Sequence, residues 1–194
     1  MTNDNTPAPG WTCMDCQFGG AGASLCRKAD GSHNFDVLAR AYLADSEDQD
    51  VADVRHRAFD CVGEMVAAAP AAAAGFLVVA CAQCRDISEL CVIAAGPLED
   101  LLEAHGPAVI AHLEKRAKVD PKFRLMLSGT WGRDRIDPDV WARLVTAVTP
   151  GPVIDHDGRT PSAGTAAPVV TETELKALFS TQARVISTPP ERLQ

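Results

Sequence analysis

The sequence has no hydrophobic run of the roughly 20 residues that a membrane-spanning helix needs. Its most apolar stretch, residues 67–82, is largely alanine and is interrupted by Pro70 and Gly75. The first ten residues, MTNDNTPAPG, lack the basic and then apolar segments of a secretory signal. We therefore expect no contact with a membrane, and we place the protein in the cytoplasm.

Basic residues are also in deficit, because 18 lysines and arginines stand against 26 aspartates and glutamates and leave a net charge of −8. Such a chain repels phosphate backbones, which disfavours direct binding to nucleic acid. The sequence contains no GxSxG elbow, phosphate-binding loop, HExxH helix or dinucleotide fingerprint. With no recognisable catalytic motif, binding is favoured over catalysis.

What the sequence does contain is enough apolar material for one packed domain with tails, since 46% of its 194 residues are hydrophobic and 23% are charged. Composition divides the chain into four segments. Residues 1–33 are rich in glycine and cysteine and show no periodicity, whereas residues 34–148 carry nearly all the apolar periodicity. Residues 149–170 have the proline and glycine content of a flexible linker, and residues 171–194 hold a short amphipathic helix and a tail.

Residues 34–148 carry the start and stop signals of helices. Asn34 and Asp50 are candidate N-caps, and Asp86 with Glu89 forms a capping-box pattern. Residues 71–83 predict a buried helix. Four prolines suit the first position of a helix: Pro97, Pro107, Pro121 and Pro138. Gly96 and Gly106 are expected to end the preceding helices with positive φ.

No alternating apolar run of strand length is present, so the predicted fold class is all-α. We expect a compact bundle of short antiparallel helices, loosely like a helical-repeat stack, with irregular extensions at both ends. Helices of about ten residues are marginal alone, so packing against each other must stabilise them.

Two segments, AAGPLEDLLEAHG and DPKFRLMLSGTWGR, resemble a family of uncharacterised bacterial proteins classed as a domain of unknown function. The resemblance covers roughly Phe35 to Val148 and is most specific at Gly96–Leu102 and at Trp131-Gly132. It implies a small helical fold and carries no reaction or ligand. The cysteine-bearing N-terminal segment and the chain after Pro150 lie outside the pattern.

Seven cysteines, an odd number without a secretory signal, argue against a disulfide framework. Cysteines in the helical segments are expected to be small core residues: Cys61, Cys81, Cys84 and Cys91. The other three, with one histidine, form the pattern C-x2-C-x9-C-x6-H: Cys13, Cys16, Cys26 and His33. These four ligands would suit one structural zinc, the only cofactor that we expect. Because the intervals do not match a common zinc finger, a flexible arm with incidental cysteines is the alternative.

Glu99, Asp100 and His105 resemble an acid–base set, but their spacing places them on different sides of a helix. Helix-dipole interactions explain them better, with the carboxylates near an N-terminus and His105 near a C-terminus. Trp131 and Arg133 suggest either a core anchor or an exposed anchor for a partner. The structural reading is favoured, with the arginines of this segment pairing with Glu99 or Asp100.

The favoured function is a non-enzymatic protein-binding module of unknown pathway, with Glu99, Asp100, His105, Trp131 and Arg133 as candidate binding residues. One version neutralises a basic partner, as immunity proteins and antitoxins do, through an acidic face formed by Glu47, Asp48, Asp50 and Asp53. The alternatives are a zinc-binding structural or regulatory module and an enzyme of unrecognised type. A capping box at Thr171 and Glu174 predicts a C-terminal helix that docks either on its own domain or on another chain.

Overall fold

The computed structural model describes residues 26–28, 32–44, 48–149, 151–154, 173 and 176–180. The helices follow one another as α2 (Phe35–Tyr42), α3 (Gln49–Ala68), α4 (Pro70–Gln83), α5 (Ile87–Ile93), the π-helix η1 (Ala94–Leu98), α6 (Glu99–Val119), α7 (Pro121–Leu127) and α8 (Pro138–Val148). Within these ranges there is no β-strand, and Arg27 and His33 form an isolated bridge. The predicted all-α class is confirmed.

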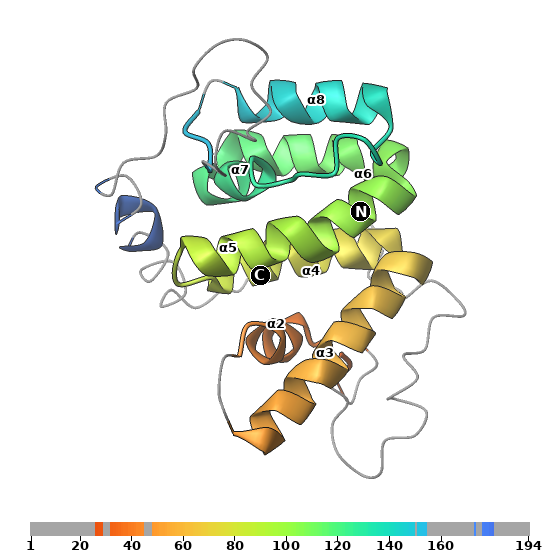
Figure 1. Ribbon diagram of the computed structural model, residues 1–194, viewed down its shortest axis with the longest axis vertical. Coiled ribbons are helices and arrows are strands. Elements are labelled where there is room, and N and C mark those ends of the chain that lie inside the picture. The colour runs from red at the N-terminus through yellow and green to blue at the C-terminus, as the bar shows by residue number, and fades with distance from the viewer. Residues whose placement is uncertain are drawn as a thin grey trace, which may run out of the picture.

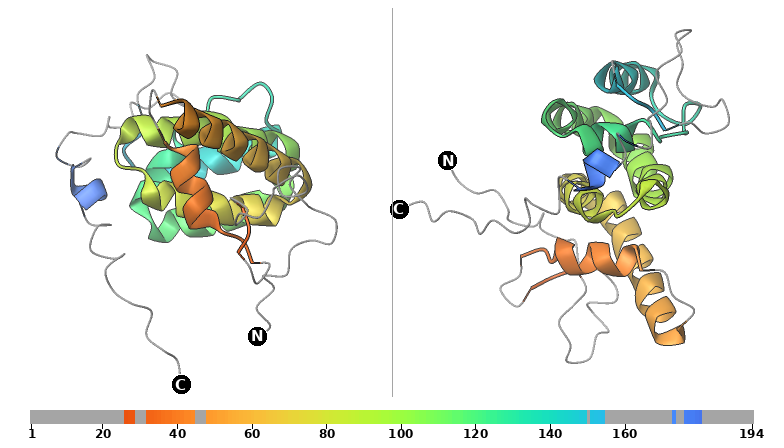
Figure 2. Two further views of the ribbon diagram at one scale, coloured as in Figure 1. Left: turned by 90° about the horizontal axis from the view of Figure 1, so that it is seen from below. Right: turned by 90° about the vertical axis from the view of Figure 1, so that its left-hand side faces the viewer.

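The helices are stacked in layers (Figure 1). Helix α8 packs on α6 and α7, these two pack on α4, and α4 packs on α2 and α3. In the right-hand view of Figure 2, α6, α7 and α8 are seen nearly end-on, whereas α2 runs across the picture. The stack therefore consists of the roughly aligned helices α4 to α8, with α2 lying crosswise and α3 running obliquely at one end.

Aspartate side chains cap four of these eight helices, α3, α5, α7 and α8, although one cap differs from the prediction. Asp48, not Asp50, caps α3, because its carboxylate accepts the Asp50 amide at 2.9 Å and the Val51 amide at 3.4 Å. Asp86 caps α5 as predicted and accepts the Glu89 amide at 2.9 Å, but Glu89 accepts the Arg85 amide instead of completing the capping box. Asn34 stands at the N-cap of α2 without a side-chain capping bond.

Two of the four predicted proline starts are confirmed, at Pro121 and Pro138, where Asp120 and Asp137 supply the cap. The other two prolines follow kinks in a helical run that continues from α5 through η1 and α6. These kinks lie at Gly96, with φ −112° and ψ −106°, and at His105, with φ −138° and ψ 18°. The prediction of positive φ at Gly96 and Gly106 is wrong, because the chain bends at these sites without reversing. Helix α3, with 20 residues, is about twice as long as expected, whereas the 21 residues of α6 comprise two helical segments that meet at the His105 kink.

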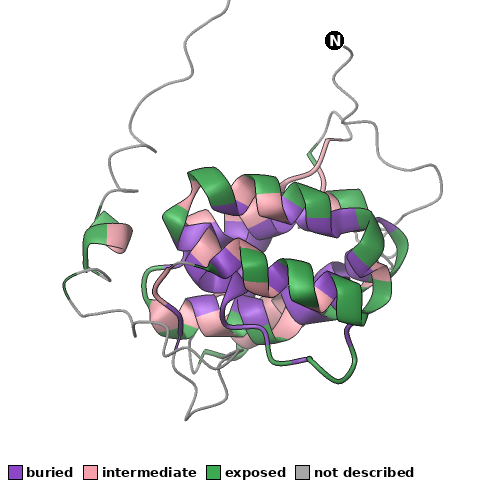
Figure 3. Ribbon diagram, turned by 90° about the horizontal axis from the view of Figure 1, so that it is seen from above, coloured by how far each residue is buried: buried purple, intermediate pink, exposed green. Residues whose placement is uncertain are grey.

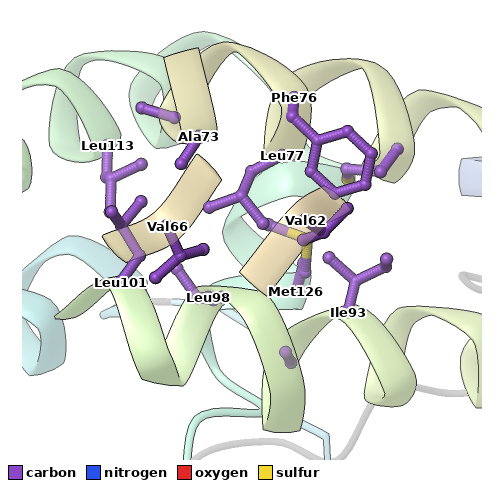
Figure 4. Close-up of a cluster of buried hydrophobic side chains, with 14 of the residues drawn as sticks. Val62, Val66, Ala73, Phe76, Leu77, Ile93, Leu98, Leu101, Leu113 and Met126 are labelled. Atoms are coloured by element: carbon purple, nitrogen blue, oxygen red, sulfur yellow. The ribbon is translucent and has the colours of Figure 1, made fainter. Parts of the chain in front are cut away.

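The core lies where α3, α4, η1, α6 and α7 meet (Figure 4). Val62 and Val66 of α3 face Phe76 and Leu77 of α4, with Leu98 of η1 beside them. The exposed residues lie on the outward sides of the helices (Figure 3). Cys61, Cys81 and Cys84 are buried, which confirms the prediction that they are core residues, while Cys91 is half-buried. Among the described helices, none has both the length and the apolar character needed to cross a lipid bilayer.

Packing extends beyond the segment 34–148 at both ends. Cys26 is fully buried in the core, and so is Ile154, whose amide donates to Ser128 Oγ at 3.0 Å. Leu178 and Phe179, of the described helical residues 176–180, pack against the same core. The C-terminal segment therefore contacts its own domain. The capping box at Thr171 and Glu174 lies outside the described residues.

Candidate functional site

Glu99 joins the two segments that carry the family resemblance. It is the first residue of α6, and its carboxylate is buried, with 4% of the residue exposed. Glu99 Oε2 accepts the backbone N–H of Trp131 at 3.0 Å. The conspicuous Gly96–Leu102 and Trp131-Gly132 segments, distant in sequence, are thus in direct contact.

Arg135 neutralises this buried carboxylate. Its guanidinium donates to Glu99 Oε1 and, through its other terminal nitrogen, to Glu103 Oε2 at 2.7 Å. Glu99 and Glu103 lie four residues apart on α6, so one arginine can bridge both. The predicted pairing of an arginine of this segment with Glu99 is confirmed for Arg135. A buried charge of this kind requires such compensation, because an unpaired carboxylate costs several kcal/mol in the interior.

Gly132 makes the close approach possible. A Cβ atom added there would lie 2.9 Å from Glu99 Cγ and 3.0 Å from Glu99 Cδ and Oε1. The carboxylate occupies the space that any larger residue would fill. A glycine therefore follows Trp131 because Glu99, at the start of α6, takes the space that a side chain at position 132 would need.

We call the segment from Thr130 to Ile136 the Trp131 turn. Its first and last residues are buried, whereas Trp131 is exposed. Thr130 and Ile136 are buried, and the amides of Arg135 and Ile136 both donate to the Gly132 carbonyl at 2.9 Å. The Trp131 side chain is 47% exposed. Trp131 is not the buried core residue that the favoured interpretation expected, because 47% of it is exposed, while its backbone N–H donates to Glu99.

The other two residues of the suspected acid–base set have separate surroundings. His105 Nε2 lies 3.2 Å from the carbonyl oxygen of Ala67, in the last turn of α3. Asp100 lies near Tyr42, and burial, followed by the charge of Asp100, raises the pKa of Tyr42 to about 12. Desolvation also raises the pKa of the Asp100 carboxyl.

The structure does not assemble these residues into an acid–base site. Glu99 is committed to Trp131 and Arg135, and His105 contacts the end of α3. His105 lies at the kink where two helical segments of α6 meet, so it stands at the end of the first segment, as predicted. Arg133 is exposed on the Trp131 turn, and its backbone amide donates to the Trp131 carbonyl at 2.8 Å.

The start of helix α3 holds three of the four residues of the expected acidic face, Asp48, Asp50 and Asp53. The carboxylate of Asp48 caps the helix, and Asp53 accepts a hydrogen bond from Gln49 at 2.8 Å. Three basic or titratable residues follow at once: Arg55, His56 and Arg57. Glu47 lies outside the described residues. The net charge of −8 is thus not concentrated on this helix.

Two of the four predicted zinc ligands, Cys13 and Cys16, lie outside the described residues. The other two flank a short antiparallel pairing, in which the Asn34 amide donates to the Cys26 carbonyl at 2.9 Å and Arg27 pairs with His33. The Cys26 thiol is buried, and the His33 ring stacks on Phe35 with ring centroids 4.7 Å apart. Backbone pairing thus brings the two neighbourhoods together, and the zinc site, which also needs Cys13 and Cys16, stays a prediction.

Sequence reasoning missed one buried charge, Lys122. It is the second residue of α7, yet only 3% of it is exposed. Its ammonium donates to the Cys84 carbonyl at 2.6 Å and to the Ala82 carbonyl at 3.2 Å, at the C-terminal end of α4. No spacing in the sequence indicates this contact, because it joins residues about 40 positions apart.

A search of curated proteins and of solved structures found no match to this chain. A family model, described as a family of unknown function (DUF6869), matches residues 45–151. The matched range contains η1, α6 and the Trp131 turn, and so both halves of the Glu99 contact, while α2 lies before it. Since the match covers more than half of the sequence, the chain belongs to this family of unknown function.

Proposed function

We propose that the chain is a non-enzymatic protein-binding module that uses Trp131 as the anchor of its interface. The observation that carries this proposal is the exposure of 47% of Trp131 on a turn whose backbone is held by buried Glu99. Large exposed aromatic residues on a fixed backbone are typical of binding hot spots, which are enriched in tryptophan and arginine.

Rigidity of the Trp131 turn supports the same function. The bonds from Trp131 to Glu99 and from Arg135 and Ile136 to Gly132 are all made within the described chain, without a partner. A turn that is already ordered loses little conformational entropy on binding. Arg133, exposed two residues from Trp131, supplies a second group suited to an interface.

The partner that we propose is a protein with a basic surface. Long-range attraction to a chain with net charge −8 would accelerate its association. Neutralisation of such a partner, as by an immunity protein or antitoxin, is one instance of this function. We place the protein in the cytoplasm, which would keep its buried cysteines, among them Cys61, Cys81 and Cys84, reduced.

The test compares partners retained by the wild-type chain and by two variants in quantitative affinity purification. Trp131→Ala is expected to lose a partner that the wild type retains, since removal of a hot-spot tryptophan costs about 2 kcal/mol or more, a loss of about 30-fold in affinity. Arg133→Ala should weaken the same partner to a smaller extent.

Val119→Ala is the matched control. Val119 is 76% exposed at the end of α6, so this substitution removes exposed apolar surface away from the Trp131 turn. It should retain the partner. An identical set of partners for Trp131→Ala and the wild type, with both proteins folded, would contradict the proposal. So would the absence of any protein enriched by the wild type.

A further inference from the structure

A cavity of about 670 Å³ opens between α2, the C-terminal end of α4 and the start of α7. Its apolar wall consists of Val78, Val79, Ala82 and Phe179. A smaller hollow of about 380 Å³ shares Arg40, Gln83 and Arg85 with it. Small-molecule sites are commonly concave, mostly apolar and of this volume, with a few polar groups that orient the ligand.

Lys122 lines this cavity and holds the C-terminal end of α4. Its ammonium bonds the carbonyls of Ala82 and Cys84, which the end of α4 leaves without intrahelical partners. The same nitrogen lies 4.6 Å from the centre of the Phe179 ring, so a cation–π contact joins the C-terminal segment to α7. Lys122 is therefore a structural cap of α4 that also adds positive charge at the cavity.

The lining is positive on a protein that is acidic overall. Three cationic residues, Arg40, Arg85 and Lys122, line the cavity with one carboxylate, Asp36, in a chain of net charge −8. Arg85 Nε donates to Glu89 Oε1 at 2.7 Å, whereas Arg40 has no ion pair among the described residues. A guanidinium without a carboxylate at the rim of an apolar cavity is suited to a planar anion.

Gln83 adds an unused acceptor at the same place. Its side-chain nitrogen donates to the backbone and carboxylate oxygens of Asp36, both at 3.2 Å. Its Oε1 atom is buried and accepts no hydrogen bond from the described residues. A buried acceptor of this kind favours a water molecule or a ligand hydroxyl at the polar end of the cavity.

We propose that this cavity binds a small amphipathic monocarboxylate, with its apolar body against Val78, Val79 and Phe179 and its carboxylate at Arg40. Asp36 in the lining and Glu89 beside Arg85 would repel a dianion such as phosphate more strongly than a monoanion. The residues involved are distinct from those of the Trp131 turn, so this site and the proposed protein-binding surface can fail separately.

The test is titration of the full chain with sodium octanoate, followed by calorimetry and by amide chemical shifts. Saturable binding is expected, with shifts at α2, at the end of α4 and at the start of α7. Arg40→Gln should weaken octanoate binding by about three- to tenfold, as expected for loss of one partly exposed charge-assisted contact. Phe179→Ala should also weaken it, through loss of apolar wall. Lys122 is left unchanged because it caps α4.

Arg57→Gln is the charge-matched control, since Arg57 is exposed on α3 and does not line this cavity. It should bind octanoate as the wild type does. 1-Octanol, which lacks the carboxylate, and inorganic phosphate, which lacks the apolar body, should each bind more weakly than octanoate. The proposal is overturned by absence of saturable octanoate binding, by equal effects of Arg40→Gln and Arg57→Gln, or by phosphate binding as tight as octanoate.

Discussion

At the scale of single residues, Glu99 and Gly132 depend on each other. The Glu99 carboxylate is stable in the interior because Trp131 N–H and Arg135 donate to it. It reaches these donors because Gly132 has no side chain in its path. The conformation of the Trp131 turn therefore depends on the ionic contact between Glu99 and Arg135 and on the absence of a side chain at Gly132.

Gly132→Ala is expected to destabilise the protein by about 1–3 kcal/mol, as overpacking at a closely packed site generally does. The added methyl would lie 2.9 Å from Glu99 Cγ, and Glu99 is held by its hydrogen bonds and has little freedom to move away. Unfolding in urea, followed by circular dichroism, gives the change in the free energy of unfolding.

Gly63→Ala is the control for this substitution. Gly63 lies inside α3, and a Cβ atom added there has nothing within 4 Å. It should therefore stabilise the protein by about 0.5–1 kcal/mol through the helix propensity of alanine. Equal stability of Gly132→Ala and the wild type would mean that Glu99 does not need this space.

At the scale of helices, local chemistry sets where most elements begin. Asp120-Pro121 and Asp137-Pro138 combine a capping carboxylate with a proline that needs no amide hydrogen bond, and both start helices as predicted. Pro97 and Pro107 carry the same residue type but follow kinks in a continuing helical run. A glycine and not a capping aspartate precedes each of these two prolines, and each glycine lies close to another helix, Gly106 to Val140 of α8 and Gly96 to Tyr42 of α2.

The cap of α3 provides a test at this scale. Asp48→Ala should lower the free energy of unfolding by about 1 kcal/mol, because its carboxylate accepts two amides at the start of the helix. Asp50→Ala should cost no more than about 0.5 kcal/mol, since Asp50 only contributes a favourable charge in the first turn. Both values come from urea unfolding. A larger loss of stability for Asp50→Ala than for Asp48→Ala would indicate that Asp50, as the sequence predicted, caps the helix.

At the scale of the whole molecule, short described segments on either side of residues 34–148 pack against the helical stack. Cys26 and Ile154 are part of the core, and Phe179 contacts Lys122. Composition suggested a tail and a linker at these places because glycine and proline are frequent there, yet short apolar pieces within them still bury their side chains. Residues 26–28 of the N-terminal segment are accordingly folded, and metal coordination would stabilise this segment further.

The zinc prediction is tested by metal analysis of the purified full chain. We expect about one zinc per chain, held by Cys13, Cys16, Cys26 and His33. Cys16→Ser should lose the metal, because a structural site needs all four ligands. Cys91→Ser, which changes a half-buried cysteine of α5 outside this set, should retain it. A wild-type chain without zinc would leave the cysteines as incidental residues of the N-terminal segment.

The sequence by itself determined the helical class, the helices begun by Asp-Pro pairs and the buried cysteines, because these depend on interactions within a few residues or on apolar periodicity. Only the tertiary structure decided that Glu99 holds the Trp131 turn, that Trp131 is half exposed and that buried Lys122 lines a cavity. Each of these features joins segments more than 30 residues apart. Their contacts follow from how the helices stack, which the spacing of residues along the chain does not specify.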